Sequence, residues 1–404
     1  QFASYNSIPF ILLCRPDASL SFPSSSLSTL LPFVNPEVRN VSKPTIATHH
    51  IPVKITLQNP PFSFISLNIP LIQPCLGGLK PIICKLLQAQ ILKPVNSPHN
   101  TPILAVKKTD EPYCLVQISE LLIGGGANSS GCPQPIYLLS LIPPSITHFS
   151  VLEPKNTFFI IPLNLAPQSL FAFTWSNPYT HMSTQLTWII LPQGFQDSPH
   201  LFRQALIEDL AELPLAPSTL LQYINNTLLC SPSLNLSIHP THHSASKLSP
   251  FLGILGLTHK GQVTQPQVTY LGLILIPNIQ AIPTQWKKLI RDMPLSHTKN
   301  LLSFLSLVGY FWLWIPNLLT KLLYTTSRGP ILEHLDPVCT IDSQFKKLKN
   351  ALSMSPALGL PNPNKPFTLY VHSNQGLVLG LLCQTFSGTP QAIVYLSKQL
   401  NSVI

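Results

Sequence analysis

The sequence predicts an α+β protein of several domains, because stretches with helical spacing of apolar residues are interleaved with short strand-like stretches. The chain has 404 residues, and this length corresponds to roughly two to four domains. Apolar residues make up 45% of it, which is ample for a buried core and unlike the composition of a disordered chain. The sequence shows no internal repeat.

The first third of the chain begins with a stretch rich in Ser, Pro and Leu and continues into alternating elements. Residues 1–40 lack periodicity and are expected to form a linker or a poorly ordered leader. The elements expected after it are strands within 52–65, a helix over 80–91, and strands over 101–107 and from 113 onwards. The glycine-rich stretch 124–131 lacks the Lys-Ser/Thr of a phosphate-binding loop, so we assign it as an ordinary loop.

The middle of the chain is rich in predicted strands and contains one strongly marked helix. Strands are expected over 149–152, 157–161, 171–175 and 186–191. Ser198-Pro199 then predicts a helix with an N-cap serine and a proline at its first helical position. Its apolar face is formed by Leu201, Phe202, Ala205, Leu206 and Leu210.

The last third combines helices with a final sheet. One strand is expected over 268–275, followed by helices over 284–293, 298–308 and 342–352, and by a strand over 367–371 that pairs with 376–384. Three histidines, His239, His242 and His243, lie close together. A metal site and a solvated loop are both compatible with them, and the loop is favoured because no acid or cysteine joins the group.

Charge and cysteine content restrict the class of protein. Charged residues are only 9% of the chain, against about 25% in typical soluble proteins, so we expect self-association through bare apolar surface. The net charge of +10 fits a nucleic-acid partner, and it fits equally well a chain that has simply lost acids. The eight cysteines form no CxxC pair. A zinc site is therefore not expected. Free thiols in a reducing compartment, cytoplasmic or nuclear, are the default expectation. Secretion and membrane insertion are not expected, because the sequence has no signal peptide and no apolar run long enough to span a membrane.

The most informative segment runs from Leu220 to Leu229, where two apolar runs flank Asn225-Asn226. Asn tolerates positive φ, so the pair suits a tight two-residue hairpin turn. From Leu213 through Arg291 the sequence contains no Asp or Glu. The hairpin therefore has no acidic neighbour along this stretch.

Several ordered motifs make the chain resemble a retroviral reverse transcriptase of the gammaretrovirus and endogenous retrovirus type. Leu191-Pro192-Gln193-Gly194-Phe195 precedes Ser198-Pro199, Leu201-Phe202 and the Tyr-x-Asn-Asn hairpin. The other matching segments, in order, are Gly78-Leu79-Lys80-Pro81, Ser97-Pro98-His99-Asn100-Thr101-Pro102, Val106-Lys107-Lys108, Val151-Leu152-Glu153, Phe158-Phe159, Gln185-Leu186-Thr187-Trp188, Tyr270-Leu271-Gly272, Leu313-Trp314-Ile315-Pro316, Pro356-Ala357-Leu358-Gly359-Leu360-Pro361 and Tyr395-Leu396-Ser397-Lys398. Together they cover the chain from about residue 30 to its end.

The resemblance implies a right-hand polymerase followed by a partial RNase H-like connection domain. The implied division is a leader over 1–40, fingers over 41–150, palm over 151–275 with interleaved fingers segments, thumb over 276–335, and a truncated connection domain over 336–404. The implied activity is RNA-directed DNA polymerisation on an RNA or DNA primer-template with dNTP substrates. No RNase H active site is expected in the chain.

The family's three metal-binding carboxylates map onto Glu153, Asn225 and Asn226. Family members use Mg²⁺ or Mn²⁺, and these ions prefer anionic oxygen ligands. Glu153 keeps its charge but is one methylene longer than the aspartate of the family, whereas Asn225 and Asn226 are neutral amides. Metal binding is therefore expected to be weak at Glu153 and lost at the two asparagines.

The resemblance also implies a nucleotide pocket. Its positions are Lys108 for the triphosphate, Cys114 in place of a family arginine, Phe158 as the steric gate, Gln193 on the template and dNTP side, and Tyr223 in the hairpin. A lysine can still act as a point charge, but Cys114 removes a phosphate clamp.

Three functions remain open at this point. The chain is an inactive, decayed endogenous polymerase, a working reverse transcriptase with an unusual metal site, or a non-enzymatic protein that binds nucleic acid or related polymerases. The first is favoured because the three metal-ligand positions that the resemblance implies keep only one negative charge, that of Glu153, after the hairpin has lost both of its own.

Overall fold

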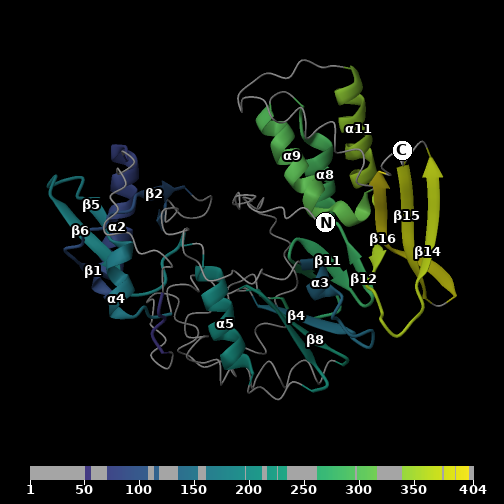
Figure 1. The fold of residues 1–404 in the computed structure, drawn as a ribbon, viewed down its shortest axis with the longest axis horizontal. Coiled ribbons are helices and arrows are strands. Elements are labelled where there is room, and N and C mark those ends of the chain that lie inside the picture. The colour runs from purple at the N-terminus through teal and green to yellow at the C-terminus, as the bar shows by residue number, and fades with distance from the viewer. Residues whose placement is uncertain are drawn as a thin grey trace, which may run out of the picture.

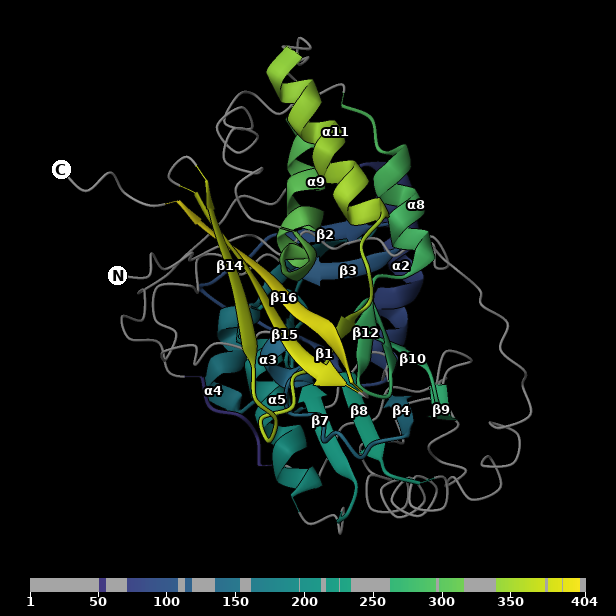
Figure 2. The same ribbon diagram turned by 90° about the vertical axis from the view of Figure 1, so that its right-hand side faces the viewer.

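A two-lobed arrangement of sheets and helices forms the part of the chain that the structure describes, and its mixed α+β class is the one that the sequence predicts (Figures 1 and 2). The structure is a computed structural model. It describes residues 51–55, 71–107, 113–117, 135–152, 161–195, 197–211, 216–224, 226–233, 262–295, 298–315, 339–374, 377–386 and 388–399. Within these residues the strands form five sheets.

The first lobe is built around helix α2 (Gln73–Gln88) and two small sheets. Strands β1 (Leu92–Pro94), β6 (Ser183–Trp188) and β5 (Phe173–Ser176) form one antiparallel sheet, and β2 (Ile103–Val106) and β3 (Cys114–Gln117) form the other. The short helices α4 (Leu165–Gln168) and η5 (Ser169–Phe171) precede β5. Leu79, Ile83 and Leu86 bury one face of α2 in this core.

Helix α2 begins earlier and ends earlier than the expected helix over 80–91. Pro74 lies in its first turn, where a proline's missing N–H costs nothing. The helix ends because Gln90 adopts a left-handed conformation with φ of 57°. Gly78 lies against the ring of Tyr113, the residue just before β3. A Cβ at Gly78 would be 1.9 Å from a carbon of this ring. Only glycine permits this close approach.

The second sheet system is a four-stranded antiparallel sheet in the order β7-β8-β4-β9. Its strands are β7 (Thr219–Tyr223), β8 (Asn226–Ser231), β4 (His148–Leu152) and β9 (Gln262–Gln265). Helix α3 (Pro135–Leu139) contributes Leu138 and Leu139 to the core around this sheet. The expected strand over 149–152 is confirmed as β4.

Helix α5 (Ser198–Leu210) confirms the expected helix but corrects its start. Asp197 is the N-cap residue, although its side chain makes no capping hydrogen bond. Ser198 is the first helical residue, and its hydroxyl donates instead to the Pro192 carbonyl at 3.0 Å. The predicted N-cap serine was therefore wrong by one position, because a tertiary partner takes its hydroxyl.

The expected single strand over 268–275 is two strands. β10 (Val268–Tyr270) and β11 (Leu273–Ile276) pair as a hairpin whose turn residues Leu271 and Gly272 have φ of 48° and 74°. This turn matches the handedness of the flanking strands. β12 (Ile279–Ala281) and β13 (Leu358–Gly359) complete the sheet in the order β10-β11-β12-β13.

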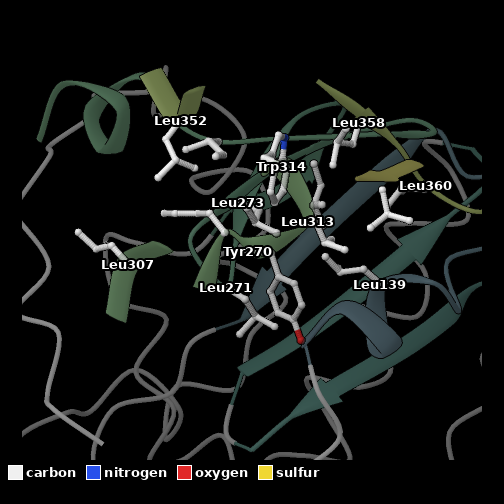
Figure 3. Close-up of a cluster of buried hydrophobic side chains, with 14 of the residues drawn as sticks. Leu139, Tyr270, Leu271, Leu273, Leu307, Leu313, Trp314, Leu352, Leu358 and Leu360 are labelled. Carbon is white, nitrogen blue, oxygen red and sulfur yellow. The ribbon is translucent and has the colours of Figure 1, made fainter. Parts of the chain in front are cut away.

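The second core joins both of these sheets to the C-terminal helices. Figure 3 shows Tyr270 and Trp314 packed among leucines from several segments. Helices α8 (Thr284–Asp292), α9 (Thr298–Tyr310) and α11 (Cys339–Ser353) lie together at one end of the molecule, and the short η6 (Trp312–Trp314) follows α9 (Figure 1). The three helices expected here are confirmed, and Phe345, Leu348 and Leu352 face inward on α11.

The chain continues into a three-stranded antiparallel sheet beside these helices. Its order is β14 (Thr368–Asn374), β15 (Leu377–Phe386) and β16 (Thr389–Gln399), which leaves β14 at an edge. The expected pairing of 367–371 with 376–384 is confirmed by the register of β14 and β15.

Some sequence expectations lie outside the described residues. They concern residues 1–40, most of the strands within 52–65 and over 157–161, the glycine-rich stretch 124–131 and the histidines His239, His242 and His243. Among the described residues, no helix is long and apolar enough to cross a membrane.

Candidate polymerase-type active site

The hairpin that carries the two asparagines is formed by β7 and β8. Tyr223 pairs with Asn226, so the turn consists of positions 224 and 225. The expected Asn-Asn turn is therefore shifted by one residue, because Asn226 is the first residue of a strand. Ile224 has a φ of 54°, an unusual conformation for a β-branched residue. Asn225 lies outside the described residues.

Strand β4 lies directly beside the hairpin. Its last residue, Leu152, pairs with Thr227, which follows Asn226 in the sequence. The described end of β4 therefore leads the chain toward the hairpin turn. Glu153, the residue that follows Leu152, lies outside the described residues, as do Lys108 and Phe158.

Two buried polar side chains, Tyr270 and Gln222, hydrogen-bond to the backbone of the hairpin. The Tyr270 hydroxyl donates to the Asn226 carbonyl at 3.3 Å, and Figure 3 shows this hydroxyl directed away from the surrounding leucines. The Gln222 amide donates to the Ile224 carbonyl at 2.9 Å and to the Arg203 carbonyl at 3.3 Å. Both side chains therefore hold the backbone of the hairpin through hydrogen bonds to carbonyl groups, and they are not exposed as possible ligands.

Two of the predicted nucleotide-pocket residues meet although they are 79 positions apart in the sequence. The Cys114 thiol donates to the Gln193 side-chain oxygen at 3.3 Å. The backbone supports this contact, because the Gln117 amide donates to the Gln193 carbonyl at 3.0 Å. Gly194 has a φ of 103°, and a Cβ there would be 1.8 Å from the Gln117 carbonyl oxygen. Glycine is therefore required for the segment to lie on β3.

Helix α5 connects the two halves of the site. Its first residue, Ser198, bonds the Pro192 carbonyl next to Gln193, and its Arg203 carbonyl accepts from Gln222 on the hairpin. Arg203 lies five positions after Ser198, which is a rise of about 7.5 Å along the helix axis. The segment 191–195 and the hairpin are therefore held by one rigid element.

The donor set of the hairpin fits a pair of divalent ions poorly. Two-metal phosphoryl transfer uses ions about 4 Å apart, and Mg²⁺ prefers anionic oxygen. Asn226 supplies only an amide, and the sequence supplies a second amide at Asn225. Among the described residues, no group of three or more His, Cys, Asp or Glu side chains could hold a metal ion.

The nearest thiol along β8 does not help. Cys230 is fully buried, and burial raises the pKa of its thiol far above the usual range. Thiolates, not thiols, bind metals. Cys230 is therefore a core residue of the sheet β7-β8-β4-β9.

The sequence analysis did not identify the residues whose hydrogen bonds hold the backbone of the site in place. Gln222 and Tyr270 each belong to a quoted motif but were assigned no role, and Ser198 was assigned only a helix-capping role. A glutamine within the apolar run Leu220-Leu221-Gln222 was the available signal, because a buried amide needs partners.

The comparisons with known proteins agree with the motifs. The model of the RNase H-like domain found in reverse transcriptase matches residues 340–403. The Pol polyprotein of feline endogenous virus ECE1 is 37% identical over 338 residues, covering 81% of this chain and 32% of the relative. The Gag-Pol polyprotein of avian reticuloendotheliosis virus is 35% identical over 373 residues, covering 90% and 32%. The chain thus spans about a third of these curated relatives or less.

Solved structures share the fold. The foamy viral protease-reverse transcriptase in complex with an RNA/DNA hybrid aligns with a TM-score of 0.71 and 20% identity, covering 90% of this chain and 47% of that one. A version of that protein in complex with double-stranded DNA aligns with a TM-score of 0.68 and 19% identity, covering 90% and 61%.

Proposed function

We propose a function from the premise that this chain is a homologue of the reverse transcriptase region of gammaretroviral and endogenous retroviral Pol polyproteins, with their RNase H-like domain at its C-terminal end. The chain is a right-hand polymerase fold that no longer performs metal-dependent nucleotidyl transfer. Its fingers, palm, thumb and connection regions follow the division given above. The implied substrates are dNTPs and a primer-template.

The observation that carries this proposal is the amide pair on the hairpin. The homologous activity needs divalent ions held by carboxylates, and Glu153 alone would leave one formal negative charge where the family has three. Amide oxygens are weak Mg²⁺ ligands, and their NH₂ groups turn donors toward a cation. Asn226 begins β8, directly beside the end of β4, which is the place where the family's carboxylates would converge.

The nucleotide side of the site supports the same conclusion. The Cys114 thiol is a short, neutral group whose hydrogen bond goes to Gln193. An arginine at this position would offer several donors to a triphosphate, and a thiol cannot replace them. We therefore expect weak dNTP binding even where the fold is intact.

The test is primer extension with purified protein. We expect no incorporation with Mg²⁺ or Mn²⁺ above the level of a Glu153→Gln variant, which removes the remaining carboxylate without changing its size. Metal-dependent incorporation well above that control would refute the proposal.

A revertant separates a lost ligand set from a lost fold. The double variant Asn225→Asp/Asn226→Asp restores two carboxylates of nearly the same size. We expect it to bind Mn²⁺ more tightly than the native chain in a calorimetric titration. Equal binding by both proteins would mean that the hairpin is not where the metal site failed.

A second candidate function is nucleic-acid binding without turnover. It is supported by the net charge of +10 and by the absence of Asp and Glu from residues 38–109 and 154–196. Salt-dependent binding to a primer-template, with no extension, would select it. Binding that is independent of salt would count against it.

A further inference from the structure

A braced loop at the outer end of the first lobe presents an exposed aromatic ring. Residues 177–182 connect β5 and β6, and the Asn177 side chain accepts from the backbone amides of Tyr179 and Thr180 at 3.0 and 3.4 Å. The backbone N–H of Asn177 donates to the Met182 carbonyl at 3.0 Å, and this hydrogen bond closes the loop. Tyr179 is 70% exposed on this loop. The ring is thus held out from the protein by bonds that do not involve its own side chain.

A lysine of helix α2 lies over the same ring. The Lys80 ammonium is 3.9 Å from the centre of the Tyr179 ring, within the range of a cation–π interaction. Cys84 and Lys85 follow on the exposed side of the helix. Figure 1 shows α2 beside the β5–β6 hairpin, at the end of the molecule opposite the sheet β14–β16.

The charged side chains in the described residues of the first lobe are all lysines. The described part of the first lobe, residues 51–55, 71–107, 113–117 and 161–195, contains five lysines and no Asp or Glu. These lysines are Lys54, Lys80, Lys85, Lys93 and Lys107. A cationic surface with a rigid exposed ring matches a ligand that is both anionic and flat.

We propose that Tyr179 and Lys80 form a binding site for single-stranded nucleic acid on the outside of the first lobe. A base stacks on the free part of the Tyr179 ring, and the Lys80 ammonium contacts an adjacent phosphate. Stacking accepts every base, so the site reads no sequence. The partner class rests on the second candidate function, but the site lies apart from the hairpin and needs neither metal nor dNTP.

The experiment measures binding of a fluorescent oligo-dT of about 15 nucleotides, near the upper end of usual site sizes, in the presence of EDTA. The Tyr179→Ala variant should bind about tenfold more weakly, the loss typical of one stacked base. Tyr179→Phe keeps the ring and should bind like the native chain. Tyr137→Ala, at an exposed tyrosine of α3, is the matched control and should also bind normally.

Two further measurements separate this site from general attraction to a polyanion. Lys80→Gln should reduce the slope of log affinity against log salt by about 0.7, as expected for one lost phosphate contact on a single strand. An abasic oligonucleotide of the same length should bind the native chain about as weakly as oligo-dT binds Tyr179→Ala.

If Tyr179→Ala and the native chain bind oligo-dT equally, the proposed Tyr179–Lys80 site is refuted. The second candidate function, nucleic-acid binding without turnover, still stands in that case if the primer-template binds. Failure to bind any nucleic acid overturns both. Neither result bears on the loss of catalysis, which the extension assay tests separately.

Discussion

At the scale of single residues, the hairpin turn stores backbone strain. Ile224 has a φ of 54°, whereas the β11–β12 turn of the same chain places Asn278 at a φ of 62°. Asn tolerates this region, and a β-branched residue there costs roughly 1–3 kcal/mol. We therefore expect Ile224→Asn to raise the free energy of unfolding by about 1 kcal/mol, measured by urea denaturation.

The control for this prediction is Ile276→Asn, at a half-buried isoleucine that ends a strand without positive φ. It should destabilise the protein, because it removes apolar contacts and relieves no strain. If both variants lose stability equally, Ile224 contributes mainly through packing, and the strain argument fails.

A second residue-scale prediction concerns His99 and pH. Its ring is buried, and desolvation lowers the pKa of its imidazole below the usual 6.5. The unfolded chain therefore binds a proton more readily than the folded chain does. The contribution of neutral His99 to the free energy of unfolding should be fully present above pH 6.5. It should decrease as the pH falls from 6.5 toward the lower pKa of the folded state.

Urea denaturation at several pH values between about 5 and 7.5 tests this, since the expected loss lies below the ordinary histidine pKa. A His99→Gln variant cannot titrate there and should show a flatter pH dependence of stability. His181→Gln, at an exposed histidine, should retain the native dependence. An unchanged slope in His99→Gln would assign the effect to other groups.

At the scale of elements, helices were predicted better than turns and boundaries. Helix α8 and the inward face of α11 follow directly from apolar spacing, which one segment carries by itself. The turn at Leu271-Gly272 and the shifted start of α5 were missed. Both depend on tertiary partners, such as the Pro192 carbonyl that takes the Ser198 hydroxyl, and local patterns do not encode these.

Two lysines join α8 and α11 reciprocally, and this predicts a measurable loss on removing either. The Lys287 ammonium donates to the Ser355 carbonyl at 2.7 Å, and the Lys349 ammonium donates to the Met293 carbonyl at 2.8 Å. Each carbonyl lies just beyond the C-terminal end of the other helix, where a cation is favoured. Lys287→Met or Lys349→Met should each cost about 1 kcal/mol of stability, measured by urea denaturation.

Lys288→Met is the matched control, because Lys288 is exposed on the same helix. Its effect should stay near zero. The double variant Lys287→Met/Lys349→Met should lose about the sum of the single losses if the two bonds act independently. A loss in Lys288→Met equal to that in Lys287→Met would attribute the effect to surface charge rather than to the carbonyl contacts.

At the scale of the whole molecule, the sequence predicted which residues belong to the candidate site but not which hydrogen bonds hold them together. The order of motifs placed Cys114, Gln193, Tyr223 and Asn226 on one fold, and the structure brings Cys114 to Gln193 and pairs Tyr223 with Asn226. No periodicity could reveal that α5 bonds both halves of the site, because both attachments are hydrogen bonds between a side chain and a backbone carbonyl, which an apolar pattern does not encode. The absence of negative charge at Asn225 and Asn226 could be predicted from the sequence, because it depends only on residue identity.

The exposed edge of the C-terminal sheet carries the last prediction, that the chain self-associates through β14. Leu369, Tyr370 and Val371 are 53%, 55% and 61% exposed on a strand that pairs on only one side. Among the described residues no strand pairs with the other side of β14, and the strand has no charged residue, so it lacks the lysine that commonly protects such edges. Val371→Lys should lower the fraction of oligomer seen by sedimentation velocity at a given concentration. Ile207→Lys adds the same charge at an exposed position of α5 and should not. An equal fall in both variants would make net charge, rather than the β14 edge, the determinant of association.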